Sequence, residues 1–211
     1  MTAYLSYFSS FFILIPLLFG LLLRIYQKKG ILFIFLLTLL SFLIEVLNLT
    51  LALAGKNNLF IQDIYTPLEF TLFALFYKKF FDSFRTSLIH YFIIAAFITV
   101  ALIDSFFIND FFTINYFSDS LEAIVFILYS LTAFFFIMKN LIYDDLLNTP
   151  FFWINIAILI YFAGNLFLFM FSNYLQQNNR EQYLAVYNIH SITNIIFYIL
   201  ISIGFWKSAK T

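Results

Sequence analysis

The sequence lacks cysteine altogether, and this absence excludes three kinds of chemistry at once. No disulfide can form, no thiolate can hold a metal ion, and no cysteine can act as a nucleophile. Glycine is scarce as well, with five residues in 211, and no glycine-rich phosphate-binding loop is present. The two histidines, His90 and His190, are too far apart in sequence to form a zinc-hydrolase motif. The sequence therefore predicts no cofactor and no metal ion.

Charged residues are also scarce. Charged residues make up 10% of the chain and the formal net charge is zero, so the basic face that nucleic-acid binding requires is missing. Apolar residues make up 64%, and the mean hydropathy is +0.97. Soluble domains have about half apolar and a quarter charged residues. The composition therefore predicts an integral membrane protein, with the lipid bilayer as its first partner and no nucleic-acid partner.

Seven segments are apolar and long enough to cross a bilayer, which takes about 20 residues per helix. They are 4–25, 31–54, 60–80, 87–108, 117–138, 151–174 and 186–206. The predicted fold is all-α: a polytopic integral membrane protein forming a single seven-helix transmembrane domain over residues 1–211. The basic residues near the first segment follow its apolar run instead of preceding it, so we expect a retained span and no signal peptide.

The Lys and Arg residues predict the orientation. With seven spans, nine of them lie on one side of the membrane, while Lys56 and Arg180 lie on the other. The side richer in basic residues is cytoplasmic by the positive-inside rule, so the N-terminus is expected outside and the C-terminus in the cytoplasm. Heavy use of Phe, Ile, Leu, Tyr, Asn and Lys is typical of AT-rich genomes. It favours a bacterial source, and hence the bacterial cytoplasmic (inner) membrane.

Polar and small residues recur at helical spacing, which predicts one polar face on each of several spans. In the second span this face carries Thr38, Ser41, Glu45, Asn48 and Ala52, and in the third Gln62, Thr66 and Glu69. In the fifth it carries Asp119, Glu122, Phe126, Tyr129 and Ala133. The sixth and seventh spans add Asn155, Phe162, Asn165, Ser172, Tyr187, His190, Asn194 and Tyr198. In lipid, such faces should point to the interior of a bundle.

Depth places the most polar of these residues at one level, because a helix rises about 1.5 Å per residue. We expect a ligand-binding pocket in the outer half of the membrane, lined by Glu69, Glu45, Glu122, Asn48, Asn165, His190, Asn194 and Tyr198. An acidic residue at the centre of a span raises the free energy of membrane insertion by about 2.5–3.5 kcal/mol. A residue that opposes insertion in this way is more easily explained by a functional role. The alternative interpretation is that these groups only hydrogen-bond one helix to another.

No motif assigns the chain to a family, and several mechanisms are excluded. The last predicted span has no lysine before Lys207 that could hold retinal, and no Gly-x-Ser-Gly protease turn occurs. We expect a sensor or receptor-type module that binds a small molecule and acts through a membrane or cytoplasmic partner protein, with 139–150 as the favoured cytoplasmic contact. The alternatives are a small proton-coupled transporter, a membrane enzyme acting on a lipid, and an accessory structural subunit. Whether the protein is an enzyme stays open.

Overall fold

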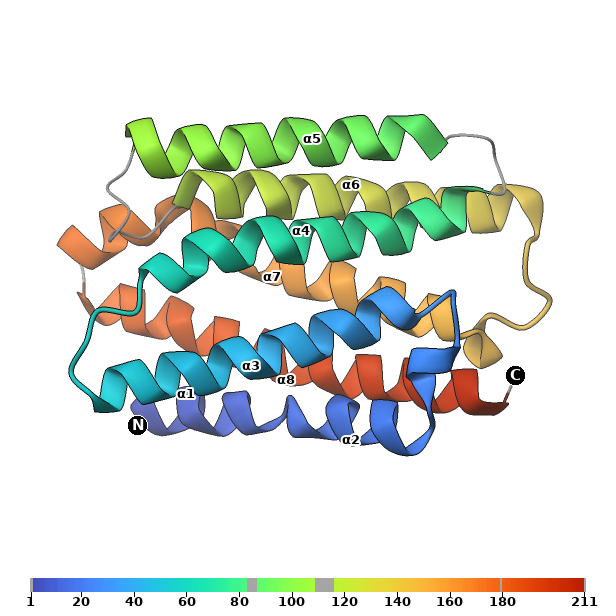
Figure 1. The fold of residues 1–211 in the computed structure, drawn as a ribbon, viewed down its shortest axis with the longest axis horizontal. Coiled ribbons are helices and arrows are strands. Elements are labelled where there is room, and N and C mark those ends of the chain that lie inside the picture. The colour runs from blue at the N-terminus through green and yellow to red at the C-terminus, as the bar shows by residue number, and fades with distance from the viewer. Residues whose placement is uncertain (1, 83–86, 109–115, 179, 211) are drawn as a thin grey trace. The chain divides into compact units, whose positions relative to one another are not determined.

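The computed structural model of the chain describes residues 2–82, 87–108, 116–178 and 180–210. Helices account for 89% of the structure, and the described residues form no β-strand, so the all-α prediction is confirmed (Figure 1). Five stretches are long and apolar enough to cross a membrane: Leu32–Leu53, Leu88–Phe106, Phe117–Asn140, Pro150–Phe171 and Leu184–Lys210. These five correspond to the second, fourth, fifth, sixth and seventh predicted spans.

The other two predicted spans are helical but differ from these five. The first is divided into α1 (Thr2–Phe11) and α2 (Leu14–Leu22). Pro16 has no N–H to donate to the carbonyl of Phe12, which instead accepts from Ile15 at 3.1 Å, and the helix breaks there. The third corresponds to α4 (Phe60–Phe81), which is long enough, but its acidic and basic side chains dilute its apolar character.

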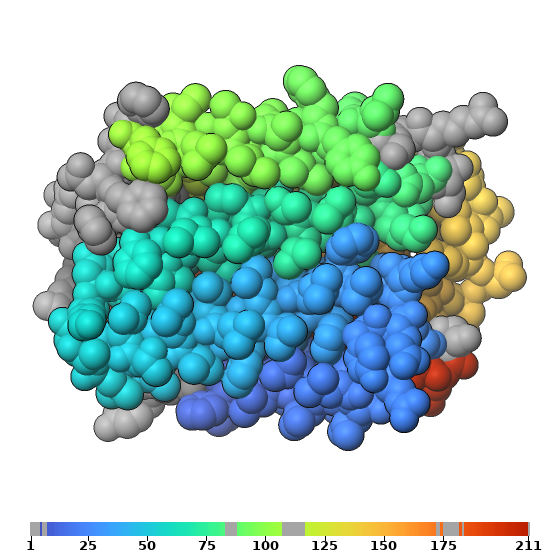
Figure 2. Space-filling model, viewed as in Figure 1, coloured from blue at the N-terminus to red at the C-terminus, as the bar shows by residue number. Residues whose placement is uncertain are grey.

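The chain forms two compact units, Tyr26–Glu122 and Met1–Ile25 with Ala123–Thr211, and each is described by itself. In the first unit, α4 packs between α3 (Leu32–Leu53) and α5 (Ser87–Ile103), as Figures 1 and 2 show. A π-helix, η3 (Asp104–Ile108), continues α5, and the unit ends in the first turns of α6 (Tyr116–Asn140).

In the second unit, α7 (Pro150–Asn178) packs along α8 (Arg180–Lys210), and α1 and α2 pack against the other side of α8 (Figure 1). A hydrogen bond of 3.1 Å from Asn155 to the carbonyl of Ser130 joins α7 to α6, and the rings of Phe126 and Phe162 lie 5.2 Å apart on the same two helices. Gly164 allows α7 and α8 to approach closely, because a Cβ at this position would lie 2.6 Å from Thr193 Cγ2.

Large apolar side chains remain exposed along many helices. Leu22, Leu53 and Leu88 are each about four-fifths exposed, at 78%, 80% and 83%. Contiguous apolar surface of this kind is rare on soluble proteins and is typical of a surface that faces lipid or a partner.

Candidate functional site

Among the acidic side chains that the structure describes, five are buried, and all five belong to the Tyr26–Glu122 unit. We call them the acidic cluster: Asp63, Glu69, Asp104, Asp119 and Glu122. The cluster forms where α4 and α6 begin and α5 ends, so residues from three helices converge. The spacing explains the placement, since Asp63, Thr66 and Glu69 follow one face of α4, while Asp119 and Glu122 follow one face of α6.

One hydroxyl joins the two faces. Thr66 donates a hydrogen bond of 3.0 Å to Asp119 Oδ1, and Gln62 Nε2 donates one of 3.1 Å to Thr66 Oγ1. The hydroxyl of Tyr65 interacts with Glu69 and lies 2.8 Å from Ser41 Oγ on α3. The polar network thus connects α3, α4 and α6 at the level of the acidic cluster.

Asp104 ends the regular part of α5 and is fully buried. Its Oδ2 accepts hydrogen bonds from the backbone N–H of Ser118 at 3.1 Å and from the hydroxyl of Ser118 at 2.6 Å. The first N–H groups of a helix lack partners within the helix, and a carboxylate there is also favoured by the helix dipole. Asp104 therefore caps α6 and fixes the start of the helix that carries Asp119 and Glu122.

The acidic cluster brings several carboxyl groups close together. Glu69, Asp119 and Glu122 lie close enough to repel one another. None of these three pairs with a Lys, Arg or His in the described part of the chain. Glu122 is 3% exposed, and its Oε1 is buried without a hydrogen-bond partner there. The described residues also contain no set of three acidic or histidine side chains placed to hold a metal ion.

An aromatic layer lies along α4 beyond Glu69. Phe70, Phe73, Phe76 and Tyr77 are all buried, and the ring of Phe70 stacks on that of Phe97 with centroids 3.7 Å apart. The face of α6 beyond Glu122 changes in the same way, to the buried Phe126, Tyr129 and Ala133. Each helix therefore carries its carboxyl groups at one end and apolar or aromatic side chains further along.

The other unit contains a separate polar group around Asn165. Its amide Nδ2 donates to the carbonyl of Tyr161 at 2.8 Å, so its Oδ1 faces His190 Nδ1 at 3.1 Å and the hydroxyl of Thr193 at 3.1 Å. An amide oxygen only accepts, so His190 must carry its proton on Nδ1. Asn165 Nδ2, His190 Nδ1 and the Thr193 hydroxyl each have an acceptor, and these hydrogen bonds join α7 to α8.

The predicted pocket residues thus fall into two groups. Glu69 and Glu122 come together in one unit, and Asn165 and His190 come together in the other. Asn194 and Tyr198 follow His190 along α8 and are half-buried. Asn48 is half-buried on α3, and its carbonyl accepts from Asn58 at 3.5 Å. Glu45 is exposed on α3, although its face begins at the buried Thr38. The side chain of Ser172 lies outside the described residues.

The set of predicted site residues omitted three members of the acidic cluster, namely Asp63, Asp104 and Asp119. Asp119 was detectable, since it stands three positions before Glu122 on the same predicted face. Asp63 has the same relation to Thr66. Asp104 gave no such signal, because its role depends on the return of the chain at Ser118.

No protein-family model, curated protein or solved structure matches the chain. The function must therefore be argued from these residues.

Proposed function

We propose that the protein is an integral membrane protein of seven spans in the bacterial cytoplasmic membrane, with its N-terminus outside and its C-terminus in the cytoplasm. The two helical regions that are not long and apolar enough alone, α1–α2 and α4, would complete the seven. Helix α4 can cross because its acidic side chains, Asp63 and Glu69, are buried inside its unit, where the hydroxyl of Tyr65 interacts with Glu69. The nine-to-two distribution of Lys and Arg supports the orientation.

Within this framework the protein is a sensor or receptor-type module that binds a small organic cation at the acidic cluster. The observation that carries this proposal is Glu122 Oε1, which is buried beside two other carboxyl groups without a donor in the described structure. An ammonium or guanidinium group supplies both the positive charge and the hydrogen-bond donors that this site lacks. A metal ion fits less well, because among the described residues no three acidic or histidine side chains are placed to coordinate one metal ion.

Binding is favoured over proton-coupled transport, the second candidate. A transported ion or solute needs polar groups along its whole path, whereas α4 continues from the acidic cluster into Phe70, Phe73 and Tyr77, all fully buried. A site closed at its inner end by packed aromatic rings can hold a ligand without passing it on. It also couples ligand binding to the packing of α4, which is the property that a sensor uses.

The test is ligand-dependent thermal unfolding of the purified protein in detergent. Choline, putrescine and arginine serve as probes for quaternary ammonium, primary ammonium and guanidinium groups. A probe present at about 100 times its dissociation constant should stabilise the folded protein by about 2.7 kcal/mol. We expect at least one probe to raise the unfolding midpoint of the wild-type protein and to leave Glu122→Gln unchanged.

Glu45→Gln is the matched control, because it removes the same charge from an exposed position on α3. It should keep the full response to the probe. If no probe shifts the wild-type midpoint, or if Glu45→Gln loses the response as Glu122→Gln does, the acidic cluster is not the proposed site. Native mass spectra of the same samples would then show whether any other small molecule is retained.

A further inference from the structure

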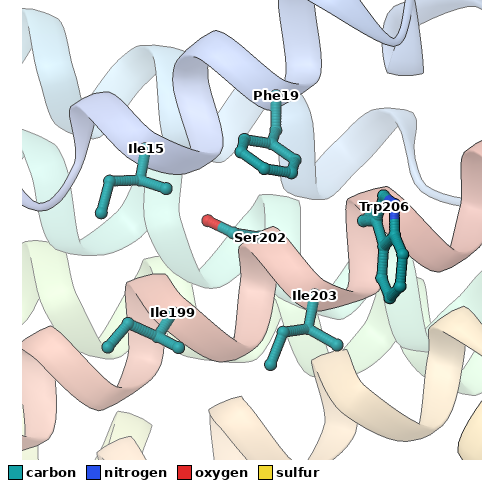
Figure 3. A pocket seen from close by; sticks show the side chains of 6 residues that line it. All are labelled: Ile15, Phe19, Ile199, Ser202, Ile203 and Trp206. Carbon is teal, nitrogen blue, oxygen red and sulfur yellow. The ribbon is translucent and has the colours of Figure 1, made fainter.

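A groove runs between α2 and α8 in the unit that does not contain the acidic cluster. Ile15 and Phe19 form its α2 side, and Ile199, Ser202, Ile203 and Trp206 form its α8 side (Figure 3). Its volume is about 280 Å³, and its lining is apolar apart from the hydroxyl of Ser202 and the indole N–H of Trp206. The hydroxyl of Ser202 already donates to the carbonyl of Tyr198 at 2.7 Å, whereas the indole N–H stands on the same residue that Lys210 approaches.

Two lysines stand at the end of this groove. Lys210 Nζ lies 3.7 Å from the centre of the Trp206 ring, and Lys207 Nζ lies 5.4 Å from it. Lys207 also donates a hydrogen bond of 2.6 Å to Asn148, which in turn donates to Asp145 through its backbone N–H at 3.2 Å. Lys210 is exposed and forms no ion pair within the part of the chain that the structure describes. The apolar groove therefore ends at the Trp206 ring, over which two positively charged lysine side chains lie.

We propose that this groove binds one acyl chain of an anionic phospholipid of the cytoplasmic leaflet, with the phosphate at Lys210 and Lys207. Charge complementarity decides the occupant: an apolar peptide would leave the positive charges of both lysines unbalanced, whereas a phosphate headgroup balances them. Trp206 suits this level, because tryptophan prefers the membrane interface, and basic residues at the inner surface attract anionic lipids. The site rests on the proposed membrane orientation but is independent of ligand binding at the acidic cluster.

Tryptophan fluorescence tests this site directly, because the chain has only two tryptophans, Trp153 and Trp206. In a Trp153→Phe protein reconstituted into phosphatidylcholine vesicles, Trp206 is the only emitter. Phosphatidylglycerol with brominated acyl chains, added in small amounts, quenches a tryptophan that it touches. We expect it to quench Trp206 at a lower mole fraction than equally brominated phosphatidylcholine does.

The variants separate headgroup from chain. Each lysine near an anionic surface contributes about fivefold in affinity, so Lys210→Gln should reduce the preference for phosphatidylglycerol about fivefold. Lys139→Gln is the control, because Lys139 also lies over an aromatic ring, Phe135 at 5.7 Å, and away from the groove lining. Ser202→Leu should fill the groove and weaken quenching by both lipids.

Four results would overturn the proposal. Equal quenching by the two brominated lipids would mean that the groove does not select an anionic headgroup. An unchanged preference in Lys210→Gln, or an equal loss in Lys139→Gln, would mean that Lys210 does not bind the phosphate. Undiminished quenching in Ser202→Leu would mean that the acyl chain lies elsewhere. The thermal response to organic cations at the acidic cluster is unaffected by any of these outcomes, so the two proposals fail separately.

Discussion

Thr66 and Asp119, 53 positions apart in the chain, are joined by a hydrogen bond of 3.0 Å between two buried side chains. The bond connects the polar face of α4 to that of α6, and the hydroxyl that makes it also accepts from Gln62. In an apolar medium a buried polar atom without a hydrogen-bond partner is costly. Replacing the Thr66 hydroxyl with a methyl group would therefore disturb the hydrogen bonding of Thr66, Asp119 and Gln62 together.

Thr66→Val should therefore destabilise the protein, although valine matches threonine in shape. The substitution leaves Asp119 Oδ1 and Gln62 Nε2 without this partner, at a cost of about 1–3 kcal/mol. Thr66→Ser keeps the hydroxyl and should retain most of the stability. The free energy of unfolding can be measured by SDS titration in mixed micelles.

Thr71→Val is the control for that substitution. Thr71 lies on the same helix, but its hydroxyl donates only to the carbonyl of Pro67, one turn earlier. Loss of the Thr71 hydroxyl should lower the free energy of unfolding by much less than loss of the Thr66 hydroxyl does. Equal losses at the two positions would mean that any buried hydroxyl on α4 matters alike and that the bond to Asp119 has no special role.

Glu122→Gln should have the opposite effect and stabilise the ligand-free protein. The amide cannot ionise beside Glu69 and Asp119, and it supplies donors to a site where Glu122 Oε1 has no hydrogen-bond partner. Relief of an unsatisfied buried group is worth about 1–3 kcal/mol. The same SDS titration measures it, with Glu45→Gln as an exposed control that should change stability by less than about 0.5 kcal/mol. Destabilisation by Glu122→Gln would indicate that the carboxylate is structural.

The helices could be predicted from the sequence because apolar length and helical periodicity are local properties. The predicted 31–54 corresponds to Leu32–Leu53, and the predicted 60–80 to Phe60–Phe81. The predicted polar face of α6 is buried throughout, including Asp119, Glu122 and Ala133, whereas the one on α8 is half-buried. Glu45 shows where periodicity fails: it shares a face with the buried Thr38 but lies where α3 is exposed. Whether a given part of a polar face is covered depends on how the helices pack against one another. The spacing of polar residues in the sequence does not determine that packing.

Close packing of α7 on α8 gives a further prediction at Gly164. A Cβ there would lie 2.6 Å from Thr193 Cγ2, so Gly164→Ala should destabilise the protein by about 1–3 kcal/mol through overpacking. Thr193→Ser removes that methyl group and keeps the hydroxyl that donates to Asn165. The double variant should therefore recover most of the loss, as measured by the same titration.

Gly30→Ala provides the control for the glycine substitution, because a Cβ at Gly30 would meet nothing within 4 Å. It should be close to neutral. If Thr193→Ser fails to compensate for Gly164→Ala, the contact between this methyl group and the α7 backbone does not limit the approach of the two helices.

Whether α4 crosses the membrane can be decided with two cysteines, because the chain has none of its own. Lys56 lies between α3 and α4, Asp144 lies between α6 and α7, and both are exposed. Three helices, α4, α5 and α6, separate the two positions. If α4 crosses the membrane, as in the seven-span proposal, the chain crosses three times and the two positions lie on opposite sides. If only the five long apolar helices cross, α5 and α6 bring the chain back, and both positions lie on one side.

We therefore expect Lys56→Cys to react with a membrane-impermeant maleimide on intact cells, and Asp144→Cys to react only after the cells are opened. Labelling of both on intact cells, or of neither, would mean that α4 does not cross, and the acidic cluster would then lie outside the hydrocarbon core. Labelling of Asp144→Cys alone would keep the crossing by α4 but reverse the orientation, placing the cluster in the cytoplasmic half. The experiment thus fixes which side of the membrane a cationic ligand must come from.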